Sequence, residues 1–458
     1  MPKAKMQSLP PEERLAQALV PADEQPYAVP ENWVWTRLES INGYQGSSVE
    51  PSRMQNCFFE LYSVPSSEYD YPEMLQGFEI GSSKQAVKKG DILLCKINPR
   101  INRVWNVSQH TKNQAVASSE WIVVRSPNIH EKYLLWCLRS VYFREFMLSN
   151  VSGVGGSLMR AQPKYVKTYP VPVAPPAEQH RIVTRIESLF EKLNRAKELV
   201  ASALSSFENR KAAILHKAFT GELTAAWRKK NGVSFDSWEH TSLGETDIEI
   251  IDGDRGENYP KKEEFVEDGY CLFLNAKNVT KNGFVFDVCQ FITKDKDLIL
   301  RKGRLMKNDV VLTTRGTIGN VAHFNDTILF ENMRINSGMV IFRAGKSLYQ
   351  PYVCLLFRSG IIYNQIASIK TGSAQPQLPI KIMINLVLPV PSVPEQLEIV
   401  RILDSLLKNE KSARELSDTL GKIDLMKKSI LARAFRGELG TNDPHEESAI
   451  NLLEESIK

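Results

Sequence analysis

The chain lacks long apolar runs, paired cysteines and paired histidines. No apolar stretch approaches the roughly 18–20 residues that a membrane span needs. The cysteines, at 57, 95, 137, 271, 289 and 354, include no C-x-x-C pair, and the seven histidines show no H-x-x-x-H or H-E-x-x-H spacing. Neither a metal centre nor a disulfide framework is therefore expected. The opening residues also lack the apolar core of a secretory signal, so we expect a reduced, cytoplasmic protein.

Catalytic motifs are missing as well. The sequence has no Walker A loop, no Asn-Pro-Pro-aromatic tetrapeptide of an aminomethyltransferase, and no Lys with Asp or Glu two residues before it, as many metal-dependent nucleases have. The glycine-rich stretch at 153–157 resembles half of a dinucleotide fingerprint. It follows a helical pattern and lacks the remaining glycines, which favours an ordinary loop. We expect no catalytic residues, no metal ligands and no cofactor in this chain.

The composition is that of a large globular protein. The 458 residues suggest two to four domains, at about 100–200 residues each. An apolar fraction of 42% and a near balance of 58 basic and 53 acidic side chains exclude a disordered or fibrous chain. The net charge of +5 permits a nucleic-acid partner without requiring one. Residues 28–170 have a net charge of +4 and residues 176–230 of +5, whereas residues 231–387 hold 18 basic and 18 acidic side chains.

An internal repeat organises the chain. Residues 172–186 match residues 389–403 at an offset of 217, and both stretches contain a Glu-Gln pair, Glu178-Gln179 and Glu395-Gln396. Residues 211–224 match residues 427–440 at an offset of 216, and both share the pattern Ala-Phe-x-Gly-Glu-Leu. A period this long indicates a duplicated unit of one domain and one helix, not a solenoid.

Each repeat ends in a stretch that predicts one long helix, over residues 176–230 (the central spacer helix) and 393–440 (the distal spacer helix). Prolines at the start and a glycine at the end, Gly221 or Gly437, suit the helix termini. Apolar residues recur at three- and four-residue spacing, and a phase slip between Ala413 and Leu416 coincides with the one-residue change of offset. We expect the helices to pack as an antiparallel coiled-coil pair, because two unrelated bundle helices would not share their flanking sequence. The expected seam residues are Ile182, Ile186, Leu189, Leu193, Phe207, Ile214, Ile399, Leu403, Leu406, Leu420, Ile423 and Ile430.

The segments before the helices, residues 27–175 and 231–392, share a weaker match that begins at Trp33 and Trp238. Both contain short β-branched runs, then a helical patch (132–148 or 348–366), then a glycine- and serine-containing loop (153–157 or 371–377). The predicted fold is α/β, of the α+β kind, with two homologous β-rich domains separated by two long antiparallel helices in a pseudo-two-fold repeat. Residues 1–26 and 441–458 are expected to form a flexible N-terminal arm and a flexible acidic tail.

Two stretches are candidates for DNA contact. In the second domain, residues 313–320 (TTRGTIGN) combine an Arg suited to guanine with an Asn suited to adenine. A tight turn that needs Gly316 and Gly319 for positive φ explains the same residues equally well, and both interpretations can hold. For the aligned stretch of the first domain, the alternative is a solvated, charged hairpin. The candidate residues are Lys96, Arg100, Arg103, Thr313, Thr314, Arg315, Thr317 and Asn320.

Taken together, these features resemble the specificity subunits of type I restriction–modification systems. The resemblance rests on the Trp-x-x-x-x-Leu starts at Trp33 and Trp238, on TRGTIGN, on the Pro-rich helix starts with Glu-Gln, and on the twice-used Ala-Phe-x-Gly-Glu-Leu ending. The first domain departs from it by lacking TRGTIG. The resemblance implies a non-catalytic subunit in which two target recognition domains each read half of a bipartite double-stranded DNA site, while the helices set the spacing.

The resemblance also implies partner proteins. Two methyltransferase subunits that modify adenine N6 would dock on the spacer helices, and two motor–endonuclease subunits would join for cleavage. S-adenosylmethionine, ATP and Mg²⁺ would then be bound by the partners alone. The residues leave two alternatives open: a self-sufficient DNA-modifying enzyme with an unrecognised active site, or a coiled-coil scaffold that binds proteins. Binding of S-adenosylmethionine by the isolated chain would favour the enzyme.

Overall fold

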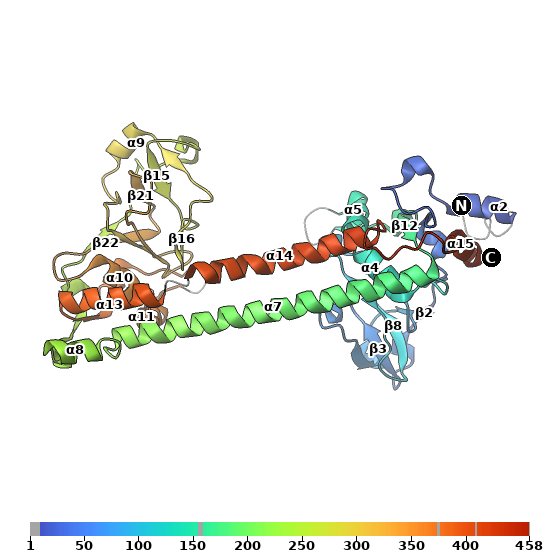
Figure 1. Cartoon of the computed structure of the whole chain (residues 1–458), viewed down its shortest axis with the longest axis horizontal. Coiled ribbons are helices and arrows are strands. Elements are labelled where there is room, and N and C mark those ends of the chain that lie inside the picture. Colours follow the sequence, from blue (N-terminus) through green and yellow to red (C-terminus); the bar gives the residue numbers. More distant parts are fainter. Residues whose placement is uncertain (1–9, 154–158, 373–375, 408–409, 458) are drawn as a thin grey trace. The chain divides into compact units, whose positions relative to one another are not determined.

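The computed structural model describes residues 10–153, 159–372, 376–407 and 410–457 (Figure 1). The chain divides into two compact units, one of residues 1–200 with 418–458 and the other of residues 201–417. Both units combine helices with strands, which confirms the predicted α+β class with two domains. In the described residues no helix is long and apolar enough to cross a membrane.

The first unit is built from short strands with helices packed beside them. Its strands are β1 (Val34–Arg37), β2 (Ser48–Val49), β3 (Phe58–Tyr62), β4 (Glu73–Gln76), β5 (Lys84–Ala86), β6 (Ile92–Cys95), β7 (Val104–Asn106), β8 (Gln114–Ala117), β9 (Trp121–Val124), β10 (Val151–Ser152), β11 (Arg160–Ala161) and β12 (Pro170–Val173). Its helices include α2 (Pro11–Ala18), α3 (Leu38–Ile41), α4 (Glu131–Arg139), α5 (Val141–Ser149), α6 (Pro163–Val166) and α15 (Ile450–Ile457). One sheet has the order β2-β5-β8-β3-β4 and another the order β7-β6-β9.

The second unit repeats this plan. Its strands are β13 (Glu239–Ser242), β14 (Glu249–Asp252), β15 (Cys271–Leu274), β16 (Val279–Thr280), β17 (Gly283–Phe284), β18 (Phe291–Ile292), β19 (Val310–Thr313), β20 (Val321–His323), β21 (Met333–Ile335), β22 (Met339–Arg343) and β23 (Val387–Val390). Its helices include α8 (Ala225–Asn231), α9 (Lys294–Ile299), α10 (Gln350–Phe357), α11 (Gly360–Ile369), α12 (Ile380–Met383) and α13 (Val393–Leu406). The sheets have the orders β14-β22-β19-β20 and β18-β15-β21.

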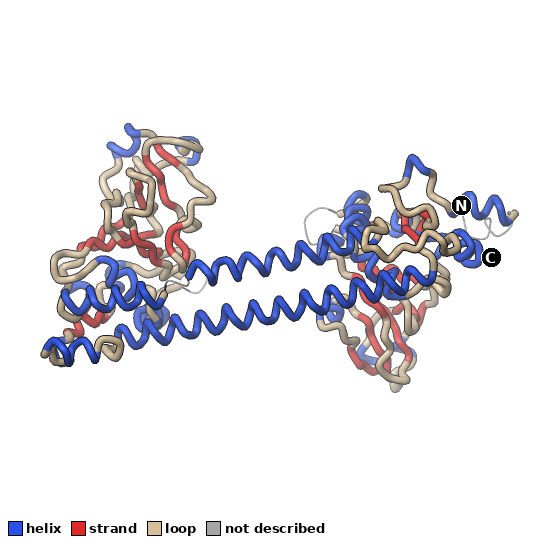
Figure 2. The backbone as a smooth tube through the Cα atoms, in the orientation of Figure 1, coloured by secondary structure: helices blue, strands red, loops and turns tan. Residues whose placement is uncertain are grey.

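Strand pairing shows the repeat more plainly than the sequence does. In each unit the first strand pairs antiparallel with the last, β1 with β12 and β13 with β23. Each unit also has a parallel pair, β3 with β8 and β15 with β21. Within the second unit, α10, α11 and α13 gather at one end, and β15 and α9 lie toward the other (Figures 1 and 2).

The long helices pack against each other within each unit. The helix α7 (Pro176–Phe219) begins in the first unit, where Ile182 and Ile186 share a buried core with Ala434 of α14 (Glu410–Ala434). Lys197 pairs with Asp424 at 3.0 Å, and the Lys427 ammonium donates to Asn194 Oδ1 at 2.5 Å. Residue numbers rise along α7 as they fall along α14, so the pair is antiparallel. In the second unit, Leu215 and Phe219 of α7 share a core with Ile399 and Leu403 of α13.

Burial separates the expected seam residues into three groups. Ile182, Ile186, Ile399, Leu403 and Ile423 are buried, and Leu189, Leu193, Phe207, Ile214, Leu420 and Ile430 are partly buried. Leu406 differs from the expectation, because its side chain is 46% exposed. Its neighbour Leu407, four residues after Leu403, packs against the second core instead.

Four expectations about the ends of the repeats are wrong. The central stretch 176–230 is not one helix, because α7 ends at Phe219 and α8 begins at Ala225. The distal stretch is not one helix, because α13 ends at Leu406 and the next described helix, α14, begins at Glu410. Residues 441–457 are not a flexible tail: Leu452 and Leu453 of the amphipathic helix α15 enter the first core, and Arg181 holds Glu446 at 2.7 Å. Residues 10–26 are not a flexible arm, because Ala18 is buried in the same core.

The duplicated Glu-Gln pair has a structural cause. In the first unit the indole of Trp33 donates to the buried Glu178 carboxylate at 2.7 Å, and the Thr441 hydroxyl donates to it at 3.2 Å. In the second unit Trp238 donates to Glu395 at 3.0 Å and Thr224 at 2.6 Å. Each glutamate lies at the start of a long helix and joins it to two other segments. One is the start of the domain, at Trp33 or Trp238, and the other is the segment that contains Thr441 or Thr224.

The glutamine of each pair fixes a second point. Gln179 Oε1 accepts the backbone N–H of His130 at 2.9 Å, and Gln396 Oε1 accepts that of Tyr349 at 2.7 Å. Both contacts fix the residue just before a helix, α4 in the first unit and α10 in the second. The repeated dipeptide thus anchors each domain to its helix.

Candidate nucleic-acid interface

The TTRGTIGN loop joins β19 to β20 and is held from within. Thr313, which is fully buried, donates its N–H to the Asn320 carbonyl and accepts the Asn320 N–H on its hydroxyl, both at 3.0 Å. The same hydroxyl donates to the carbonyl of Thr317. Gly316 and Gly319 have φ of +71° and +89°, values that an L side chain rarely adopts. The tight-turn interpretation therefore describes the loop well.

Only part of this loop faces solvent. Arg315 and Thr317 are exposed. Thr314 is buried, and its backbone pairs with the Gly338 carbonyl at 2.8 Å and with the Leu378 N–H at 3.0 Å. The side-chain amide of Asn320 donates to the Val279 carbonyl at 2.9 Å. The expectation that Thr313 and Thr314 reach DNA is wrong because both are buried, and Asn320 uses its amide to support the turn.

Neighbouring loops extend the exposed surface around Arg315. The Arg315 N–H donates to the Gly338 carbonyl at 3.3 Å, and its backbone forms a bridge with Gln377. The Arg255 guanidinium donates to the Ser337 carbonyl of the same 336–338 loop at 3.3 Å. Part of the expected 371–377 loop, residues 373–375, lies outside the described residues. We call loops 252–258, 314–320 and 336–338 the loop surface. Arg255 and Arg315, which are 60 positions apart in the sequence, both contact its 336–338 loop.

The first unit places a different loop at the equivalent position. Residues 98–102 follow the central strand β6 as residues 314–320 follow β19. Asn98 and Asn102 have φ of +49° and +54°, and the Asn102 amide donates to the Arg139 carbonyl at 2.9 Å. The loop therefore has a fixed backbone without glycine.

Of the three candidates in the first unit, Arg100 is the most exposed. Lys96 donates to the Ser119 carbonyl at 2.6 Å, and Arg103, whose side chain is 19% exposed, pairs with Glu68 at 3.2 Å. Arg100 and the half-exposed Ile101 lie on the outer side of the loop. The expected 153–157 loop lies, apart from Gly153, outside the described residues.

Metal-binding clusters and reactive thiols are the two kinds of reaction centre at issue for the described residues. No group of three His, Cys, Asp or Glu side chains among them is arranged to hold a metal ion. Burial raises the pKa of the Cys137 and Cys271 thiols to about 12, so neither is a thiolate at neutral pH. Arg255 was not among the residues that the sequence singles out, because only the fold brings it to the 336–338 loop that Arg315 also contacts.

Comparisons with known proteins point to one family. Residues 236–420 match the family described as "Type I restriction modification DNA specificity domain". The chain is 25% identical to the type I restriction enzyme EcoBI specificity subunit of Escherichia coli, over 59% of this chain and 58% of the relative. It is 22% identical to the MjaVIII specificity subunit of Methanocaldococcus jannaschii, over 90% of this chain and 94% of the relative. The chain thus spans less than two thirds of the Escherichia coli relative.

Solved structures show a related fold. A chain from a study of complex assembly and conformational transition of the type I R-M system superposes with a TM-score of 0.68 at 20% identity, covering 90% of this chain and all of the other. The HsdS subunit from Thermoanaerobacter tengcongensis superposes with a TM-score of 0.51, also at 20% identity, covering 91% of this chain and all of the other.

Proposed function

From the premise that this chain is a member of the type I restriction–modification specificity-subunit family, we propose that it recognises a bipartite double-stranded DNA site for partner enzymes. The chain is the non-catalytic subunit. One unit reads each half-site, and the partners methylate adenine N6 or, with a motor–endonuclease, cleave. S-adenosylmethionine, ATP and Mg²⁺ are bound by those partners.

One observation carries the proposal. The two units share a plan down to the Trp–Glu–Thr contacts, yet the loop after the central strand differs, with Arg100 and Ile101 in one unit and Arg315 and Thr317 in the other. A shared scaffold with different exposed side chains suits two readers of different base sequences, since base-edge contacts specify and backbone contacts position.

The partners are two methyltransferase subunits and two motor–endonuclease subunits. The spacer helices suit methyltransferase docking, because exposed apolar side chains such as Leu199 and Leu425, both 64% exposed, remain along them. The helices also suit the setting of a fixed distance between half-sites.

Mapping methylated adenines genome-wide in the host, with and without this chain, tests the proposal. We expect a two-part motif that disappears on deletion of the chain. Reintroducing the chain with Arg315→Ala should relax or abolish the half of the motif read by the second unit, whereas Arg100→Ala should affect the other half. Each variant is the control for the other. A methylation pattern unchanged by deletion would contradict the proposal.

A further inference from the structure

The second unit concentrates its positive charge in one segment. Residues 294–307, from α9 to the turn before β19, hold six basic and two acidic residues, although residues 231–387 as a whole have no net charge. The segment lies at the end of the unit remote from α10 and α13 (Figure 1). Lys296 pairs with Glu264 and Arg304 approaches Asp297, so the excess charge lies mainly on the other four basic residues, and such an excess suits contact with a polyanion.

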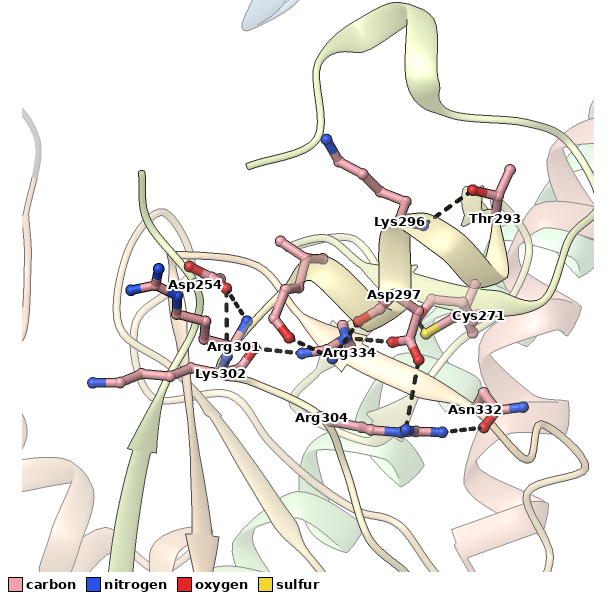
Figure 3. A network of polar contacts seen from close by, with 12 residues as sticks. Asp254, Cys271, Thr293, Lys296, Asp297, Arg301, Lys302, Arg304, Asn332 and Arg334 are labelled. Carbon is pink, nitrogen blue, oxygen red and sulfur yellow. Dashed lines mark hydrogen bonds and ion pairs between the residues drawn. The ribbon is translucent and has the colours of Figure 1, made fainter. Parts of the chain in front are cut away.

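A buried arginine donates hydrogen bonds to the backbone of this segment. Arg334, 4% exposed, donates to three carbonyls: those of Lys302 and Asp297 at 2.7 Å and that of Leu300 at 3.0 Å (Figure 3). These include carbonyls at the C-terminal end of α9 that the helix itself cannot satisfy. Arg334 also pairs with the fully buried Asp297 carboxylate, which Arg304 approaches at 3.6 Å.

A carboxylate accepts hydrogen bonds from the N–H groups of the same backbone. Asp254 Oδ2 accepts the N–H of Arg301 at 2.6 Å and that of Lys302 at 3.4 Å (Figure 3). Gly303 follows with φ of +84°, and a Cβ there would lie 3.0 Å from Ile335. The peptide at 301–302 is therefore fixed through both its donors and its acceptors.

The side chains on this fixed peptide point outward. Arg301 and Lys302 are exposed, and Figure 3 shows both side chains extending away from the buried network. Arg301 lines a surface hollow of about 310 Å³ together with Arg255, Ile299 and the acidic residues Asp254 and Glu257. Because the backbone is already fixed, anion binding carries no cost for ordering the loop, and only the side chains lose rotamer freedom.

We propose that Arg301 and Lys302, with Arg255 across the hollow, contact the phosphate backbone of the DNA that the second unit reads. This inference rests on the proposed function. Arg255 lines the hollow and also belongs to the loop surface, where its guanidinium pairs with Asp252 at 3.1 Å and donates to the Ser337 carbonyl at 3.3 Å. A buried Arg–Asp pair adds little to stability, which fits a role of Arg334 and Asp297 in positioning the loop.

Salt dependence of binding distinguishes this role from base reading. Each phosphate contact adds about 0.9 to the slope of log Kobs against log salt concentration. For Arg301→Ala/Lys302→Ala in the full chain, assembled with its methyltransferase subunits, we expect a slope smaller by about 2 and an affinity lower by an order of magnitude, roughly equally for cognate and unrelated duplexes. Lys229→Ala/Lys230→Ala, which removes two exposed lysines of α8, should leave the slope unchanged. The charge-conserving variant Arg301→Lys/Lys302→Arg should keep the wild-type slope.

The outcomes separate this inference from the function on which it rests. An unchanged slope in the alanine variant, with Arg315→Ala still weakening cognate binding, overturns the phosphate site and leaves the proposed function standing. A selective loss of cognate binding would make these residues base readers and also overturn it. If the wild-type assembly binds no duplex, the proposed function fails first. Unchanged thermal unfolding of the alanine variant excludes misfolding.

Discussion

Two buried glutamates occupy equivalent places in the two units but have different electrostatic surroundings. Glu395 accepts a hydrogen bond from the Arg228 guanidinium at 2.6 Å in addition to those from Trp238 and Thr224. In the described part of the chain, Glu178 accepts hydrogen bonds from the uncharged Trp33 and Thr441. Burial raises the pKa of Glu178, and the positive charge of Arg181 lowers it. The two copies of the repeat therefore share the hydrogen bonds from Trp and Thr to the glutamate, but only the second copy adds a charged partner, Arg228.

This difference predicts unequal costs for the same substitution. Glu395→Gln leaves the Arg228 guanidinium, 8% exposed, without its carboxylate, and should cost about 3–5 kcal/mol of stability. Glu178→Gln removes no charge partner at bonding distance and should cost about 1 kcal/mol. Urea unfolding of each full-length variant at pH 7 measures both values. Equal losses would show that Arg228 finds another partner or that the charge is not decisive.

At the same scale, the candidate site was only partly predictable. Sequence marks 313–320 as a loop with polar side chains, but it cannot tell that the Thr313 hydroxyl closes the turn while Arg315 faces outward. Burial decides that distinction, and it depends on neighbours such as Gly338 and Leu378 that are distant in sequence. The role of Arg255 was hidden for the same reason.

At the scale of elements, periodicity located the helices better than their ends. The patch at 132–148 predicted one helix, but α4 and α5 meet at Ser140, whose ψ of 157° is extended. The patch at 348–366 likewise divides into α10 and α11 around the buried Ser359. Apolar spacing runs through both breaks, so the pattern alone cannot reveal them. The docking of α15 was missed because a short helix gains its stability from tertiary packing.

Two positions on α14, two residues apart, provide a matched test of helix pairing. Ile423 is 3% exposed and Leu425 is 64% exposed, although both are aliphatic residues in the same turn. Ile423→Asp places an unpaired charge in the seam and should destabilise the first unit by several kcal/mol. Leu425→Asp should change stability by less than about 0.5 kcal/mol. Thermal unfolding checks both; a similar loss at both positions would contradict the seam assignment.

At the scale of the whole molecule, duplication explains what sequence could and could not foresee. Residues that join a domain to its helices, such as Trp33 and Trp238, are retained in both copies, so the plan of the fold was predictable from self-comparison. Residues on the outer loops have diverged, so the recognition surface was not. This contrast is expected if each copy keeps its scaffold and varies its reader.

If the helices set the spacing between half-sites, lengthening them should change the recognised DNA. A seven-residue insertion after Glu198 in α7, with seven more after Lys422 in α14, keeps the apolar seam in register and adds about 10 Å. At roughly 3.4 Å per base pair, the gap between methylated half-sites should widen by about three base pairs. Five-residue insertions at both points are the control, because they rotate the seam and should reduce assembly. Sequencing of methylated adenines reads the gap directly; an unchanged gap with seven residues inserted and methylation intact would show that these helices do not determine the spacing.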